Sequence, residues 1–203
     1  FRAGRTEQDV VNDIDRALRS LGATNTSLTC QSGVYRSGEP LIRPFASDRV
    51  LERGDMAQME IRGSYRGYGF DICRSAVIGP PNDTQRHMFE TVERMLDAII
   101  AKAAPGVRAE ELQHEIDEIA HDEGFDGYQS MPFGGPSTYC GHGLGVSNDE
   151  PPVLFTGHRT ILRPGMYITP EPGLYRHPEG GLRLEDNILI TADGCENLNT
   201  SRR

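Results

Sequence analysis

An internal repeat is the feature that most constrains the fold of this 203-residue chain. Residues 4–22 align without gaps with residues 106–124, and the end glycines and one Ile-Asp pair coincide. Residues 50–60 align in the same way with residues 161–171, and both segments finish on a glutamate. Two matches in the same order along the chain predict that one structural unit was duplicated.

The first segment of each aligned pair has the apolar spacing of an amphipathic helix and a glycine that can end it. A further helix is predicted at about 83–104, where apolar residues recur three or four positions apart until Pro105. The second segments lead into hairpin-like runs around glycines. Helices alternating with hairpins favour an α+β fold, in which helices cover an antiparallel sheet. The predicted repeats span about 1–104 and 105–203 of a single domain.

Composition excludes several functional classes. Thirty acidic and 21 basic residues give a formal net charge of −9 without any basic stretch, so nucleic-acid binding has little electrostatic support. No apolar run approaches the roughly 18 residues that a membrane span needs. The four scattered cysteines are typical of reduced thiols, which predicts a cytoplasmic protein. The chain begins at Phe1 with no recognisable leader, and we expect this to be a cut end.

Acidic side chains recur where the two repeats place strand ends. Glu60 and Asp71 are expected there in the first half, and Glu171 and Glu185 take the comparable places in the second. Pseudo-symmetry would bring the four carboxylates towards one axis. Such a cluster is stable only if protons or cations neutralise it, so the pattern predicts bound divalent ions.

One histidine lies between these elements, in a glycine-rich stretch. His142 is flanked by Gly141 and Gly143, which let the backbone pass close to a site. A shell of oxygen ligands with one imidazole nitrogen suits Mn, Co, Fe(II) or Zn. A lone histidine in such a loop is more often structural or exposed, and any one acid is more often a surface residue. The prediction therefore depends on the combination.

Taken in order, these motifs resemble the M24 metallopeptidases, the family of methionine aminopeptidase, Xaa-Pro aminopeptidase and prolidase. The resemblance covers nearly the whole chain through GRTEQDV, SDRVLERGD, the eleven-residue step from Glu60 to Asp71, GHGLG, ITPEPGLY and GLRLEDNILIT. It implies a pita-bread fold of two pseudo-symmetric halves. It also implies a hydrolase that cleaves a peptide bond next to proline through a metal-bound hydroxide. Related enzymes suggest a homodimer and an N-terminal domain that is absent from this chain.

The resemblance also implies a role for each site residue. One or two divalent ions would be held by Glu60, Asp71, His142, Glu171 and Glu185. Asp71 and Glu185 would bridge two ions, and Glu171 would carry the proton of the attacking water. Arg183 would orient the Glu185 carboxylate without binding the metal itself.

Three positions depart from the family pattern. Glu60 stands where the family usually has aspartate, and the longer side chain predicts weaker metal binding on that side. Asp149 and Arg43 stand where the peptidases place substrate-contacting histidines, and these two could form an ion pair. Two alternatives therefore stay open. One is a creatinase-type hydrolase or lyase acting on a small C–N substrate with a weakened metal site, and the other is a catalytically silent binding fold.

Overall fold

The computed structural model describes residues 1–33, 45–129 and 139–203. Its helices are α1 (Glu7–Ser20), α2 (Asp83–Lys102) and α3 (Ala109–Asp122). Its strands are β1 (Thr24–Ser32), β2 (Met56–Tyr65), β3 (Tyr68–Val77), β4 (Tyr139–Gly143), β5 (Glu150–Phe155), β6 (Tyr167–Pro170), β7 (Gly173–His177), β8 (Gly180–Arg183), β9 (Ile188–Ile190) and β10 (Cys195–Asn197).

The three predicted helices are confirmed. α1 begins at a capping box in which the Thr6 side chain accepts from the Asp9 backbone N–H, and Gly22 follows it with φ +95°. α2 begins at Asn82 with the same kind of cap and ends before Pro105. Helical periodicity and end signals were therefore sufficient to predict these elements.

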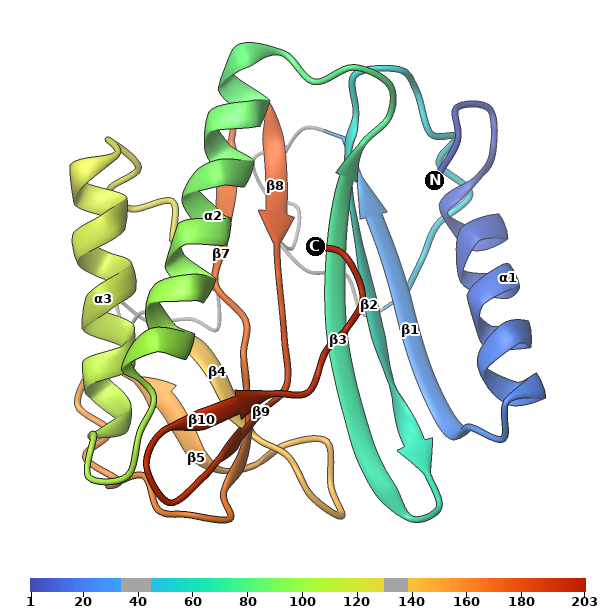
Figure 1. Ribbon diagram of the computed structural model, residues 1–203. Helices are drawn as coiled ribbons and strands as arrows, with labels where there is room; N and C mark the ends of the chain where they lie inside the picture. Colours follow the sequence, from blue (N-terminus) through green and yellow to red (C-terminus); the bar gives the residue numbers. More distant parts are fainter. Residues whose placement is uncertain (34–44, 130–138) are drawn as a thin grey trace.

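Every strand pairing among the described residues is antiparallel, as predicted, but the strands divide into three sheets instead of one. β1, β2 and β3 form one sheet, and α1 packs against β1 (Figure 1). A five-stranded sheet has the order β10-β9-β6-β4-β5, and β7 and β8 form a separate hairpin. β8 contacts β2, β3 and α2, so this hairpin joins the two halves.

Two isolated backbone bridges fall at matching positions of the proposed repeats. Thr6 bridges to Val50 in the first half, and Arg108 bridges to Ile161 in the second. Both residues of each bridge occupy equivalent places in the two sequence alignments. This correspondence supports the duplication, which stays a prediction.

Packing separates the interior into a large and a small cluster. The large one is built on one face of α2, where Met88, Val92, Met95, Leu96 and Ile99 are fully buried against α3 and the second half. The small one lies under α1. None of the described helices is long and apolar enough to cross a membrane, and all four cysteines are free thiols.

Candidate metal centre

The first two predicted ligands lie inside strands, so the prediction that they occupy strand ends was wrong. Glu60 is in β2 and Asp71 in β3, several residues before and after the turn that joins them. In the hairpin register Glu60 is opposite Cys73 and Arg62 is opposite Asp71. Alternate residues of a strand share a face, so Glu60, Arg62 and Asp71 project towards the same side.

The other three predicted ligands come from the second half. His142 is in β4 and pairs with Thr169 of β6, and Glu171 follows directly after β6. Glu185 lies two residues beyond β8, and its backbone N–H donates to the Cys73 carbonyl of β3 at 3.2 Å. This backbone contact connects the second half to the first at the level of the ligands.

The structure brings the five predicted ligand residues together. His142 Nε2 lies 3.7 Å from Asp71 Oδ2 and 3.6 Å from Glu171 Oε1. Two groups of three have ligand atoms within 4.8 Å of one another, namely Asp71, His142 and Glu185, and Glu60, Glu171 and Glu185. All five residues are buried.

Local hydrogen bonding orients the imidazole for ligation. His142 Nδ1 lies 2.9 Å from the carbonyl oxygen of Gly143. Because a carbonyl oxygen can only accept, this contact places the ring proton on Nδ1 and leaves the Nε2 lone pair facing the acids. Histidines that bind metals commonly have this arrangement.

The buried carboxyl groups lie so close together that each one disfavours the ionised form of its neighbours. Burial, followed by the charge of Glu185, raises the pKa of Asp71 to about 9. Burial also raises the pKa values of Glu171 and Glu185 above their ordinary range, although Thr169 donates to Glu185 Oε1 at 2.6 Å. Within the described part of the chain, Asp71 Oδ1 and Glu185 Oε2 have no hydrogen-bond partner. Two buried acceptor oxygens beside a free imidazole nitrogen form a donor set for a cation.

Arg183 is buried against two other predicted ligands. Its Nη1 lies 2.8 Å from Glu171 Oε2, and its Nη2 forms an ion pair with Glu60. The guanidinium therefore reaches Glu60 and Glu171 directly, whereas the resemblance implied Glu185 as its partner. Its charge nevertheless lowers the pKa of Glu185 against the effect of burial.

A second arginine at the site was missed by the sequence analysis. Arg62 Nε lies 2.6 Å from Asp71 Oδ2, and Arg62 Nη2 pairs with Asp149. The hairpin register could have revealed it, because a residue two positions after Glu60 shares its face.

Of the two predicted substrate-contacting residues, only Asp149 lies in the described part of the chain. Asp149 is mostly exposed, and its Oδ1 lies 3.5 Å from His142 Nε2 at the edge of the cluster. Arg43 lies outside the described residues, and so does any ion pair between Arg43 and Asp149.

Comparison with known proteins identifies the family. A sequence model of metallopeptidase family M24 matches residues 1–192. The chain belongs to the M24 family. It is 33% identical to an Xaa-Pro dipeptidase of Pyrococcus horikoshii over 98% of this chain and 55% of that protein.

Solved structures show the M24 fold directly. The prolidase from Pyrococcus horikoshii superposes with a TM-score of 0.89 at 33% identity, over 100% of this chain and 56% of that one. The prolidase from Pyrococcus furiosus gives 0.88, also at 33% identity, over 100% of this chain and 58% of that one. The predicted pita-bread fold is therefore confirmed. The chain spans little more than half the length of these relatives.

The donor set suits the metals of an M24 site. Asp71, His142 and Glu185 offer one nitrogen and carboxylate oxygens, of which both oxygens of Asp71 and Oε2 of Glu185 lack a hydrogen-bond partner among the described residues. Hard oxygen ligands with one imidazole suit a hard or borderline divalent ion. The residues present therefore fit a divalent ion, and this group is the better candidate because Arg183 engages two members of the other.

The glycine before the M24 histidine is required by close backbone packing. Gly141 has φ +146°, and a Cβ there would lie 2.3 Å from the Thr169 carbonyl oxygen. We expect Gly141→Ala to lower the free energy of unfolding by more than the roughly 1–3 kcal/mol of backbone strain alone, as measured by urea denaturation. Gly165→Ala is the control, because φ is also positive there (+87°) but a Cβ would meet nothing within 4 Å. Equal effects of the two substitutions would contradict the packing argument.

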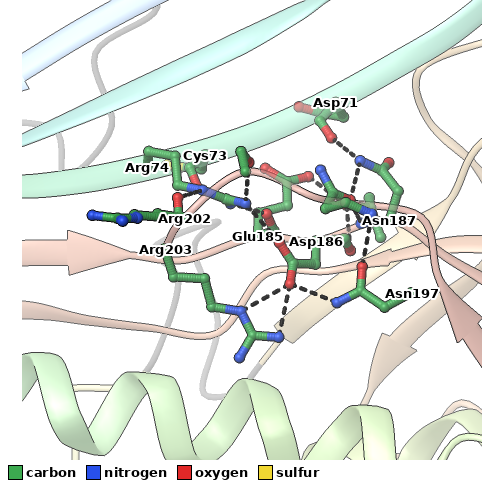
Figure 2. Close-up of polar contacts among 12 residues, drawn as sticks. Asp71, Cys73, Arg74, Glu185, Asp186, Asn187, Asn197, Arg202 and Arg203 are labelled. Carbon is green, nitrogen blue, oxygen red and sulfur yellow. Dashed lines mark hydrogen bonds and ion pairs between the residues drawn. The ribbon is translucent and has the colours of Figure 1, made fainter.

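A polar network supports the chain directly after Glu185. Asp186 is buried, and its carboxylate accepts from Arg74 at 2.8 Å, from Arg203 Nε at 2.9 Å and from Asn197 at 2.9 Å (Figure 2). Its neighbour Asn187 donates to the Asp71 backbone carbonyl at 2.8 Å. These contacts join β3, the Glu185 segment and the last residues of the chain, and so fix the backbone that carries two of the predicted ligands.

Proposed function

We propose that this chain forms the catalytic unit of a divalent-metal-dependent hydrolase that cleaves a peptide bond next to proline. The observation that carries the proposal is that four acids and His142, drawn from both halves, are buried in two groups of three that share Glu185. The relatives support the substrate class, because two relatives with 33% identity are named Xaa-Pro dipeptidases and a solved structure with 33% identity is a prolidase.

In this proposal Asp71, His142 and Glu185 hold the ion. A divalent ion supplies a Lewis acid for the peptide carbonyl and lowers the pKa of a bound water. Glu171 accepts the proton of the attacking water and returns it to the leaving nitrogen, since its carboxylate lies beside the ligand group, with Oε1 3.6 Å from His142 Nε2. Tyr139 donates a hydrogen bond to Glu171 and fixes its orientation.

Other residues orient the ligands and the substrate. Arg183 holds Glu60 and Glu171 in place from the buried side. Asp149 lies at the exposed edge beside His142, where its carboxylate can bind the free amino group of a dipeptide. Arg43 stays a candidate for substrate contact from outside the described residues.

The finer assignments also belong to the proposal. We infer Mn, Co, Fe(II) or Zn as the ion, with one or two ions per chain. We further propose a cytoplasmic homodimer, for which the free thiols are consistent with a reducing compartment. Neither nucleic acid nor a membrane is expected as a partner, given the net charge of −9 and the absence of an apolar run of spanning length.

Metal removal tests the proposed function. The purified protein, incubated with Mn, is expected to hydrolyse dipeptides such as Ala-Pro. EDTA should abolish the hydrolysis, because it withdraws the ion from the protein ligands, and added Mn should restore it by refilling the site. Ala-Ala serves as the control substrate. Turnover of Ala-Pro that EDTA leaves unchanged, or no turnover after Mn loading, would contradict the proposal.

A creatinase-type hydrolase or lyase is the second candidate. It is favoured by Arg62, whose guanidinium already pairs with one predicted ligand, and by Asp149, which replaces the histidine of the peptidases. Turnover of creatine-like or betaine-like compounds without turnover of dipeptides, unaffected by EDTA, would favour this candidate over the first.

A further inference from the structure

Arg62 crosses from the first half of the protein to the second at the edge of the ligand cluster. Its Nε lies 2.6 Å from Asp71 Oδ2, and its Nη2 pairs with Asp149 and donates to the Asn148 carbonyl at 3.2 Å. Asp71 Oδ2 and Asp149 Oδ1 both lie within 3.7 Å of His142 Nε2. The guanidinium thus binds a carboxylate that a metal would also need.

The loop that carries Asp149 is firmly docked on the β2–β3 hairpin. Asn148 Nδ2 donates to the Phe70 carbonyl at 3.1 Å, and the Gly69 N–H donates to the Gly145 carbonyl at 2.7 Å. A Cβ on Gly69 would lie 2.7 Å from Asn148 Oδ1, so the two segments are in close contact. The Arg62 bridge is therefore part of a built interface between the halves.

A cross-strand ion pair of Arg62 with Asp71 could by itself be ordinary sheet stabilisation. Two observations indicate that this ion pair also affects the candidate metal site. Asp71 is almost completely buried and belongs to a group that could hold a metal. In addition, Arg62 ties that ligand to an acid of the other half.

The charges of the buried cluster define how many ions it can take. When they are deprotonated to bind an ion, the four ligand carboxylates and Asp149 carry five negative charges, and Arg62 and Arg183 supply two positive ones within ion-pair distance. Three negative charges are left, which is enough for one divalent ion but not for two, whereas loss of Arg62 would leave four, which two divalent ions neutralise. A second divalent ion would have to displace a guanidinium or leave an excess of positive charge in a buried site, which is costly.

We propose that Arg62 is a built-in counter-charge that restricts this site to a single divalent ion, held by Asp71, His142 and Glu185. The inference rests on the proposed function but concerns the number of ions rather than the reaction. Arg62 is here a positioning residue, since it acts on a ligand and not on the substrate.

Mn binding to the purified protein tests the proposal, with isothermal titration and the electron paramagnetic resonance spectrum as readouts. The protein should bind about one Mn per chain and show the spectrum of an isolated ion. Arg62→Gln should bind about two and show the spectrum of a coupled pair, because the lost charge frees Asp71 Oδ2. Arg62→Lys keeps the charge and should stay near one. Circular dichroism checks that each variant is folded.

The outcomes separate this inference from the proposed function. Two Mn per unsubstituted chain, together with Ala-Pro hydrolysis, would overturn the role of Arg62 and leave the hydrolase intact. One Mn in both the unsubstituted protein and Arg62→Gln would also overturn it. No Mn bound by any of the proteins would overturn the metal-dependent function itself.

Discussion

Replacing His142 by alanine is expected to lower Mn affinity by more than about 100-fold and to abolish detectable Ala-Pro hydrolysis. Losing a residue that only supports a metal ligand already costs about 10–100-fold, and His142 offers the one nitrogen of the candidate group. The Nδ1 contact with Gly143 shows that this ring is oriented for ligation through Nε2. Isothermal titration with Mn and a dipeptidase assay measure the two effects.

His114→Ala is the matched control for this prediction. His114 is exposed on α3 and belongs to neither metal-binding group, so its loss should change neither affinity nor rate. Wild-type Mn binding in His142→Ala would contradict the assignment of His142 as a ligand, even if hydrolysis were lost.

Asp186→Ala is expected to produce the largest loss of stability, about 3–5 kcal/mol, because breaking a buried ion pair leaves an uncompensated charge. Asp186 is 2% exposed and is the acidic partner shared by Arg74 and Arg203 (Figure 2). The substitution would leave Arg74, whose side chain is only 16% exposed, without that partner. Urea denaturation followed by circular dichroism measures the change.

Asp97→Ala is the control that distinguishes the loss of a buried carboxylate from the loss of an exposed salt bridge. Asp97 pairs with the same Arg203, but its side chain is 64% exposed. Exposed pairs contribute at most about 1 kcal/mol, so this substitution should have a small effect. Equal losses in Asp186→Ala and Asp97→Ala would show that the buried network does not stabilise the Glu185 segment.

The helices could be predicted because their signals are local. Thr6, Gly22 and Pro105 mark helix ends within a few residues of where the structure has them. The convergence of the five predicted ligand residues could also be expected, since their types and spacings resemble those of the M24 family. Such local and ordered patterns are independent of the detailed packing.

The strand positions of Glu60 and Asp71 were predicted wrongly because glycines in this hairpin have a packing role. Gly63 lies inside β2, where a Cβ would meet the Phe70 ring at 2.6 Å, and Gly69 lies inside β3 against Asn148. The sequence predicts a hairpin-like run around these glycines. The structure uses them instead for close approach inside long strands, which moves both acids into mid-strand.

The partners of the arginines could not be predicted from the sequence. Arg183 is two residues from Glu185, but its guanidinium reaches Glu60 and Glu171, which come from other elements. Arg62 meets Asp149 only because the loop after β4 docks on the β2–β3 hairpin. Which acid an arginine pairs with depends on the direction that its long side chain takes across an interface between distant segments.

The most direct test of the central claim, that the buried acids and His142 form a cation site, is anomalous diffraction from crystals grown with Mn. We expect an anomalous peak about 2.0–2.3 Å from His142 Nε2 and from carboxylate oxygens of Asp71 and Glu185, within the usual range of metal–ligand distances. Density that shows no peak among these residues, with Asp71 still paired to Arg62 and Glu171 to Arg183, would contradict the claim.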